Sequence, residues 1–197
     1  RLLAYSTIAH AGYMMMAAAA AVQLIGAADP DRARGAVASL VVYVTTYLFM
    51  SLGAFAVVAF LRNELRSEEI KDYAGLIHQC PGLVVCMGII LFSLIGLPPF
   101  AGFVAKFSIF ASLYDAGLHT LLLVGALNTV VSLFYYLRVI KVMTIDPEPE
   151  ERPPVSLGLF SGPGGYVLLV TLPVALGILG WDGLREWSIA AASNLFQ

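Results

Sequence analysis

One lysine stands almost alone in a long apolar part of the sequence. Between Tyr73 and Leu137 the only Lys, Arg, Asp or Glu residues are Lys106 and Asp115. If the surrounding run crosses a bilayer, Asp115 lies near a helix end and Lys106 near the membrane centre, where a charge costs at least ~2.5–3.5 kcal/mol. Burial favours the neutral amine, so a lysine there can load and unload a proton, which arginine cannot do. The alternative is a lysine whose long stem reaches the interface.

Polar side chains recur at helical spacing in three other apolar segments. Their members are Ser6, His10 and Tyr13; Tyr43, Tyr47 and Ser51; and Asn128, Ser132, Tyr135 and Tyr136. Histidine titrates nearest to physiological pH and can shuttle protons, although an isolated membrane histidine also serves in packing. Each of these three sets forms a polar stripe along one helix face, and a single stripe is typical of contacts between helices. Together with a lysine beside a helix break, the three stripes predict a hydrated polar track.

The segment that carries Lys106 is too long for one straight helix. Residues 83–114 would extend about 48 Å at 1.5 Å per residue, against a hydrocarbon thickness of ~30 Å. Two adjacent prolines in its middle remove backbone donors and clash with the preceding turn. The break is expected within Gly96, Pro98, Pro99 and Gly102. Irregular backbone at membrane depth marks ion and substrate sites in transporters, whereas a simple kink would serve only packing.

Composition places the whole chain in the membrane. Its 197 residues are 59% hydrophobic and only 12% charged, and the mean hydropathy is +0.85. A soluble protein has about twice that share of charged residues, and a disordered one has more charge and less hydrophobicity. The net charge of −2 argues against nucleic-acid binding. Cys80 and Cys86 lack the spacing of a zinc site or a disulfide framework, so packing is the better interpretation.

The sequence predicts one polytopic membrane domain over residues 1–197, with an all-α integral membrane fold. Its five transmembrane segments are expected at about 2–27, 36–61, 83–114 with the break, 118–137 and 165–181. The last of them is short and interrupted by Pro173. Residues 62–72 form a charged connector, and 146–154 form an acidic, proline-rich loop.

Charge asymmetry predicts the orientation. Five crossings put the N-terminus and the 62–80 and 138–163 loops on one side, which holds seven cations against three on the other. The seven are Arg1, Arg62, Arg66, Lys71, Arg138, Lys141 and Arg152, and the three are Arg32, Arg34 and Arg185. The positive-inside rule makes the first side cytoplasmic and places the C-terminus outside.

Two motifs resemble the antiporter-like membrane subunits of respiratory complex I, an NADH:quinone oxidoreductase. Residues 1–13, RLLAYSTIAHAGY, are similar to the start of a late helix in these subunits. Residues 94–107, LIGLPPFAGFVAKF, are similar to their second discontinuous helix. The resemblance covers essentially the whole chain, as the last five of fourteen helices, and is greatest for the subunit N type. We therefore expect a longer chain, with more sequence before Arg1.

This resemblance implies a proton-translocating membrane subunit. Lys106 matches the family's terminal lysine, which passes a proton toward the outer side, and His10 matches a histidine on the path to it. The first half-channel would lie in the preceding part of the chain. The resemblance implies no catalytic residue, metal or cofactor in this chain, with NADH, FMN, iron–sulfur clusters and quinone held by other subunits. The expected partners are other membrane subunits and the lipid bilayer of a bacterial inner membrane.

Two other functions remain open from the sequence. A subunit of a multi-subunit cation/proton antiporter would share the fold, and upstream sequence would separate the two. A membrane scaffold without an ion path would tolerate a neutral residue in place of Lys106. The counter-charge of Lys106 is also open, because no acid in these segments is an obvious partner.

Overall fold

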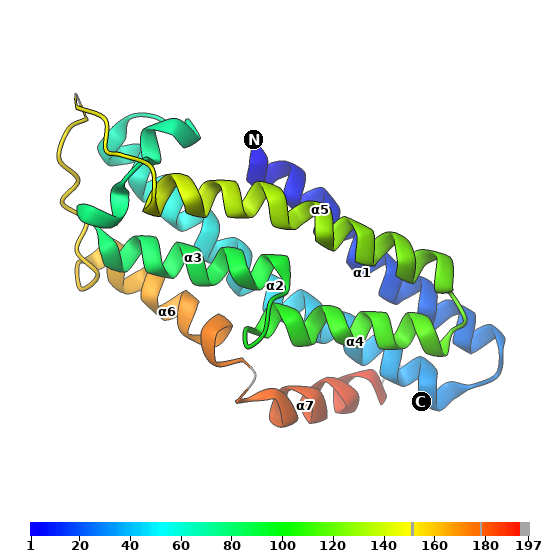
Figure 1. Cartoon of the computed structure of the whole chain (residues 1–197). Coiled ribbons are helices and arrows are strands. Elements are labelled where there is room, and N and C mark those ends of the chain that lie inside the picture. Colours follow the sequence, from blue (N-terminus) through cyan, green and yellow to red (C-terminus); the bar gives the residue numbers. More distant parts are fainter. Residues whose placement is uncertain (151, 178, 194–197) are drawn as a thin grey trace.

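The structure, a computed structural model, describes residues 1–150, 152–177 and 179–193, and this part of the chain contains helices and turns but no strand. The α-helices are α1 (Leu2–Gly26), α2 (Pro30–Leu65), α3 (Pro81–Ile95), α4 (Ala101–Asp115), α5 (His119–Thr144), α6 (Gly162–Leu176) and α7 (Trp181–Ser193), with 3-10 helices η1 (Ile70–Tyr73) and η2 (Leu76–His78). Figure 1 shows α3 and α4 following one another, with α5 along one side of them and α6 along the other side of α3. The predicted all-α membrane fold is confirmed.

Within the residues that the structure describes, three helices are long and apolar enough to cross a membrane, namely α1, α2 and α5. The number rises to five if two bent helix pairs each count as one crossing, η1 and η2 with α3 and α6 with α7. Helices α3 and α4 have 15 residues each, fewer than the ~20 that a single crossing needs. They are the two halves of the broken segment that the sequence predicts.

The break lies between Ile95 and Ala101. Gly96 ends α3 in the left-handed conformation, with φ of 90°, and the amides of Gly96 and Leu97 both donate to the carbonyl of Phe92 at 3.1 and 3.0 Å. This glycine cap ends the helix before the prolines are reached, since glycine adopts positive φ without strain. The predicted discontinuity is therefore confirmed, although Gly102 lies inside the first turn of α4 rather than in the irregular part.

Several helix limits differ from the predicted segments. Helix α2 extends beyond 36–61 at both ends. It begins early because Asp29 caps its first turn, accepting from the amide of Arg32 at 3.1 Å, and Pro30 suits the first helical position. Helix α5 likewise continues past residue 137. Pro173 does not interrupt α6, which continues to Leu176. Helix α7 was not predicted, because its pattern is amphipathic rather than apolar.

Helix α2 is the centre of the bundle and packs against α1, α3, α4, α6 and α7. Small residues allow the close approach: Ala17 and Ala20 of α1 and Ala54 of α2 are buried, and a Cβ at Gly53 would come within 2.6 Å of Ile90. Small residues commonly bring membrane helices together in this way. Cys80 and Cys86 are free and buried, as expected for packing residues.

Candidate functional site

Lys106 reaches back from α4 to the end of α3. Its side chain is 4% exposed, and its Nζ donates to the carbonyls of Leu94 at 2.9 Å and Ile95 at 3.0 Å. These carbonyls belong to the last turn of α3, where they lack partners within the helix and carry the negative end of its dipole. Hydrogen bonds to a charged group contribute ~1.5–3 kcal/mol each, comparable to the cost of placing the charge in the membrane. In the described part of the chain no acid pairs with Lys106, and the backbone of α3 supplies its counter-charge.

The two glycines of the break let the half-helices meet around this lysine. A Cβ at Gly96 would lie 3.0 Å from the Cδ of Lys106, and one at Gly102 would collide with the carbonyl oxygen of Ser93. The amide of Gly102 donates to the Ser93 hydroxyl at 2.9 Å, which ties the start of α4 to α3. Ser93 was not singled out in the sequence, and only its position before the Gly-Pro break could have drawn attention to it.

The ring of Tyr13, from α1, lies against the lysine. The Nζ of Lys106 is 4.7 Å from the ring centroid, within the range of a cation–π contact. The Tyr13 hydroxyl lies 2.9 Å from the carbonyl of Gly125 and 2.8 Å from the Thr129 hydroxyl, and it accepts from Asn128 at 3.2 Å. Tyr13 and Asn128, predicted on separate stripes, are therefore brought together at Lys106.

His10 is the centre of a second polar cluster. Its Nδ1 is 2.7 Å from the Tyr43 hydroxyl, its Nε2 is 3.5 Å from the Tyr136 hydroxyl, and its ring stacks on Tyr47 at 4.8 Å between centroids. The Tyr136 hydroxyl also bonds to the hydroxyl of Ser6. Side chains from α1, α2 and α5 thus form a buried hydroxyl–imidazole chain. The predicted meeting of the three stripes is found here.

Two further members of the predicted track, Ser132 and Ser51, are hydrogen-bonded neither to His10 nor to Lys106 in the described part of the chain. The Ser132 hydroxyl donates to the carbonyl of Thr129 in its own helix at 2.6 Å, a common way for serine to satisfy itself in a helix. Ser51 is half-buried on α2, and among the described residues its hydroxyl makes no hydrogen bond with the His10 cluster. Helical spacing puts side chains on one face but does not decide which of them meet.

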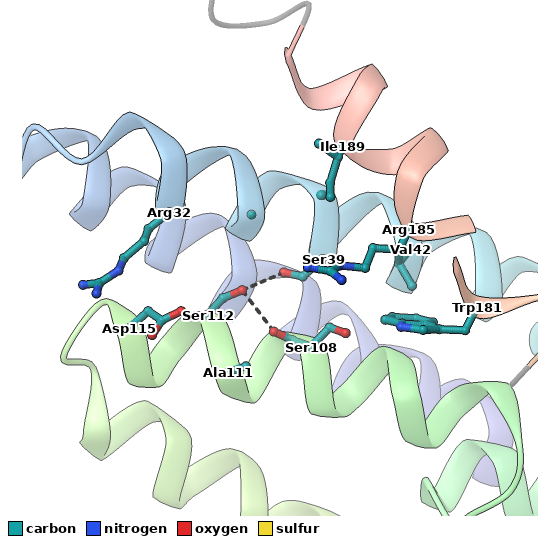
Figure 2. Close-up of a pocket in the computed structure, with 12 residues that line it drawn as sticks. Arg32, Ser39, Val42, Ser108, Ala111, Ser112, Asp115, Trp181, Arg185 and Ile189 are labelled. Carbon is teal, nitrogen blue, oxygen red and sulfur yellow. Dashed lines mark hydrogen bonds between the residues drawn. The ribbon is translucent and has the colours of Figure 1, made fainter. Parts of the chain in front are cut away.

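A pocket of about 230 Å³ opens between α2, α4 and α7, further along α4 than Lys106. Figure 2 shows the hydroxyls of Ser39 and Ser112 facing each other in it, with the charged residues around them. The two oxygens are 3.1 Å apart, and Ser112 donates to the carbonyl of Ser108 at 3.0 Å. Its lining also includes Arg32, Asp115, Trp181 and Arg185. This serine pair is not part of the predicted polar track, and its only signal in the sequence is the spacing of Ser108 and Ser112 after Lys106.

A group of buried apolar residues, called here the apolar layer, lies beside Lys106 on α4 and includes Val42 of α2, which also lines the pocket. Ala105 and Ile109 of α4 are fully buried, and Val42 of α2 is 2% exposed. All three belong to one apolar cluster with Tyr13 and Tyr43. The site therefore has three parts in sequence through the bundle: the His10 cluster, Lys106 at the end of α3, and the serine-lined pocket.

This arrangement defines a class of protein: a polytopic membrane protein in which a broken helix holds an ionisable group at membrane depth. Residues 1–132 match the family described as NADH:quinone oxidoreductase/Mrp antiporter, TM. The chain belongs to this family.

Similar proteins come from both branches that the family description names. NADH-quinone oxidoreductase subunit N of Anaeromyxobacter sp. (strain Fw109-5) is 41% identical over 207 residues, which cover 100% of this chain and 37% of that protein. The chain thus spans a little over a third of that relative. A chain of respiratory complex I from Thermus thermophilus with bound NADH has a TM-score of 0.72 at 23% identity, covering 98% of this chain and 38% of that one. A chain of the Mrp complex from Dietzia sp. DQ12-45-1b has a TM-score of 0.77 at 17% identity, covering 100% and 48%. These two structures share the fold.

Proposed function

We propose that this chain forms the C-terminal part of the antiporter-like, proton-translocating membrane subunit of an NADH:quinone oxidoreductase, of the subunit N type. The observation that carries the proposal is Lys106, buried at a helix break with backbone carbonyls as its only counter-charge among the described residues. The 41% identity to a protein named NADH-quinone oxidoreductase subunit N supports the oxidoreductase over the antiporter. The redox cofactors and the quinone belong to other subunits, and this chain couples their reaction to proton movement.

In the proposed path, the proton passes from the His10 cluster to Lys106 and then to the serine-lined pocket. The imidazole of His10 has a hydroxyl at each nitrogen, from Tyr43 and Tyr136, and can therefore accept a proton on one side and donate one on the other. Lys106 holds the proton on Nζ against the α3 carbonyls. Release requires that the proton cross the apolar layer to reach Ser112, so that layer keeps the two sides apart between transfers.

The direction of this path follows from the proposed orientation in the bacterial inner membrane. The serine-lined pocket lies at the end of the bundle that carries Arg32, Asp115 and Arg185. The charge count puts this end outside, whereas the 62–80 and 138–163 connectors face the cytoplasm. Protons would therefore leave through the pocket on the outer side.

The test is Lys106→Ala in the intact complex, reconstituted in liposomes, with proton pumping and quinone reduction measured together. We expect both to fall at least tenfold while the complex still assembles, because alanine fits a membrane helix. Lys71→Ala is the matched control, since Lys71 is exposed in the charged connector, and it should pump normally. Wild-type pumping by an assembled Lys106→Ala complex would exclude the carrier role and favour the scaffold.

A further inference from the structure

Tyr13 makes two different kinds of contact, one at each end of its side chain. Its ring, on α1, lies 4.7 Å from the Nζ of Lys106 on α4. Its hydroxyl reaches α5, where it bonds to the carbonyl of Gly125 and the hydroxyl of Thr129 and accepts from Asn128. Tyr13 is 2% exposed. It is therefore a rigid bridge between the lysine and α5.

The packing around Tyr13 leaves little freedom for the ring. A Cβ at Gly125 would lie 2.9 Å from Phe110 and 3.5 Å from the Tyr13 ring. The backbone of α5 therefore packs directly against these two rings, with no room for a side chain at this position. Phe110 and Tyr43 face the ring at 6.2 and 6.0 Å between centroids, both tilted. The ring is thus held with its face toward the ammonium.

The ring also lies against His10, 6.0 Å away between centroids. Among the described residues no hydrogen bond joins His10 to Lys106, and Tyr13 contacts both. The face of an aromatic ring carries negative charge, which attracts a cation but has no proton to exchange. Tyr13 therefore stabilises a charged Lys106 without taking its proton.

We propose that Tyr13 is a positioning residue for Lys106: its ring holds the ammonium at the end of α3, and its hydroxyl ties that ring to α5. This inference rests on the proposed function of Lys106. It adds that α5 controls how well the lysine holds its charge, through the three hydrogen bonds of a single hydroxyl. A shift of α5 moves the ring, and the lysine then loses its aromatic partner and keeps only the α3 carbonyls.

The first experiment varies the ring at position 13 in the intact complex and measures protons pumped per electron pair at verified assembly. Tyr13→Leu removes the electron-rich face of the ring and should lower this ratio about thirtyfold, the factor expected for a desolvated cation–π contact. Tyr13→Phe keeps the ring, so the number of protons pumped per electron pair should fall no more than about threefold. Tyr5→Leu is the control, because Tyr5 lies on the same helix with 74% of its surface exposed, and it should have no effect.

A second variant separates charge from shape. Tyr13→pentafluorophenylalanine has nearly the same shape as Tyr13→Phe but reverses the sign of charge on the ring face, so it should behave like Tyr13→Leu. A purely structural role predicts that the two phenylalanine variants behave alike, and this result would overturn the proposal. Wild-type pumping by Tyr13→Leu, while Lys106→Ala still abolishes pumping, would also overturn it. If Lys106→Ala itself pumps normally, the proposed function fails instead.

A double-mutant cycle tests the tie to α5 even where Tyr13→Leu does not assemble. Thr129→Val removes one partner of the Tyr13 hydroxyl at nearly constant volume, and Tyr13→Phe removes the hydroxyl itself. If both act through the same hydrogen bond, the double variant should pump no worse than Tyr13→Phe alone. Independent losses that multiply would overturn the claim that this hydroxyl connects the two helices.

Discussion

Gly102→Ala tests whether the close meeting of α3 and α4 is what forms the lysine site. The added Cβ would overlap the carbonyl oxygen of Ser93, which is backbone and cannot rotate away. The start of α4 must therefore move relative to α3, and the hydrogen bond from the Gly102 amide to Ser93 is strained or lost. Because Lys106 is one turn further along α4, its bonds to the α3 carbonyls should lengthen as well.

The expected magnitude follows from three terms. Forcing a methyl group into a packed site costs about 1–3 kcal/mol, and the lost hydrogen bond costs about 1 kcal/mol. The better helix propensity of alanine offsets about 1 kcal/mol. The net destabilisation of the α3–α4 contact is therefore about 1–3 kcal/mol. Weakening one carbonyl bond to the charged lysine, at ~1.5–3 kcal/mol, should lower proton pumping about tenfold or more.

The control is the same substitution in the other half of the broken segment. Gly88 lies in α3, and a Cβ there would meet no heavy atom within 4 Å. Gly88→Ala should pump normally and be slightly more stable, since alanine is the better helix former. Both complexes would be reconstituted in liposomes, with proton uptake, quinone reduction and thermal stability measured. If Gly102→Ala and Gly88→Ala behave alike, the close contact at Ser93 does not shape the site.

Two further predictions concern the His10 cluster and the orientation. His10→Ala should lower proton pumping only partly, because the hydroxyls of Tyr43 and Tyr136 remain and can be bridged by water. Pumping is measured with the reconstituted complex, and either complete loss or no change would contradict this prediction. Cysteines placed at Glu68 and Glu186 should be labelled by a membrane-impermeant thiol reagent from opposite sides, and labelling of both from the same side would exclude the proposed orientation.

Lys106 can be singled out from the sequence more easily than its contacts can. Lys106 is conspicuous because few other charges lie near it, and the Gly-Leu-Pro-Pro run predicts the break on steric grounds alone. Its partners proved to be the carbonyls of Leu94 and Ile95. Every residue has a carbonyl, so no residue type marks this kind of partner. Only the geometry of the helix end identifies it.

Helical periodicity had a similar limit. It placed Ser6, His10 and Tyr13 on one face of α1, but His10 meets Tyr43 and Tyr136 whereas Tyr13 meets Lys106. Which stripes meet depends on how far α1 is rotated and shifted against α2, α4 and α5. That arrangement is set by the packing of small residues, and it is not encoded in the spacing along a single helix.

A counter-charge made of backbone carbonyls suits a residue that must be charged and neutral in turn, and this leads to a last prediction. An acid beside Lys106 would hold the ammonium by a full charge, whereas the end of α3 offers about half of one, so that neither state of the lysine is strongly trapped. Lys106→Arg keeps the charge and the carbonyl partners but cannot release a proton. Its planar fork must also fit where even a Cβ at Gly96 would lie 3.0 Å from the Cδ of Lys106. Pumping by the assembled Lys106→Arg complex should therefore fall at least tenfold, as far as in Lys106→Ala. Wild-type pumping by the arginine variant would show that a fixed positive charge is sufficient, and that Lys106 does not carry the proton itself.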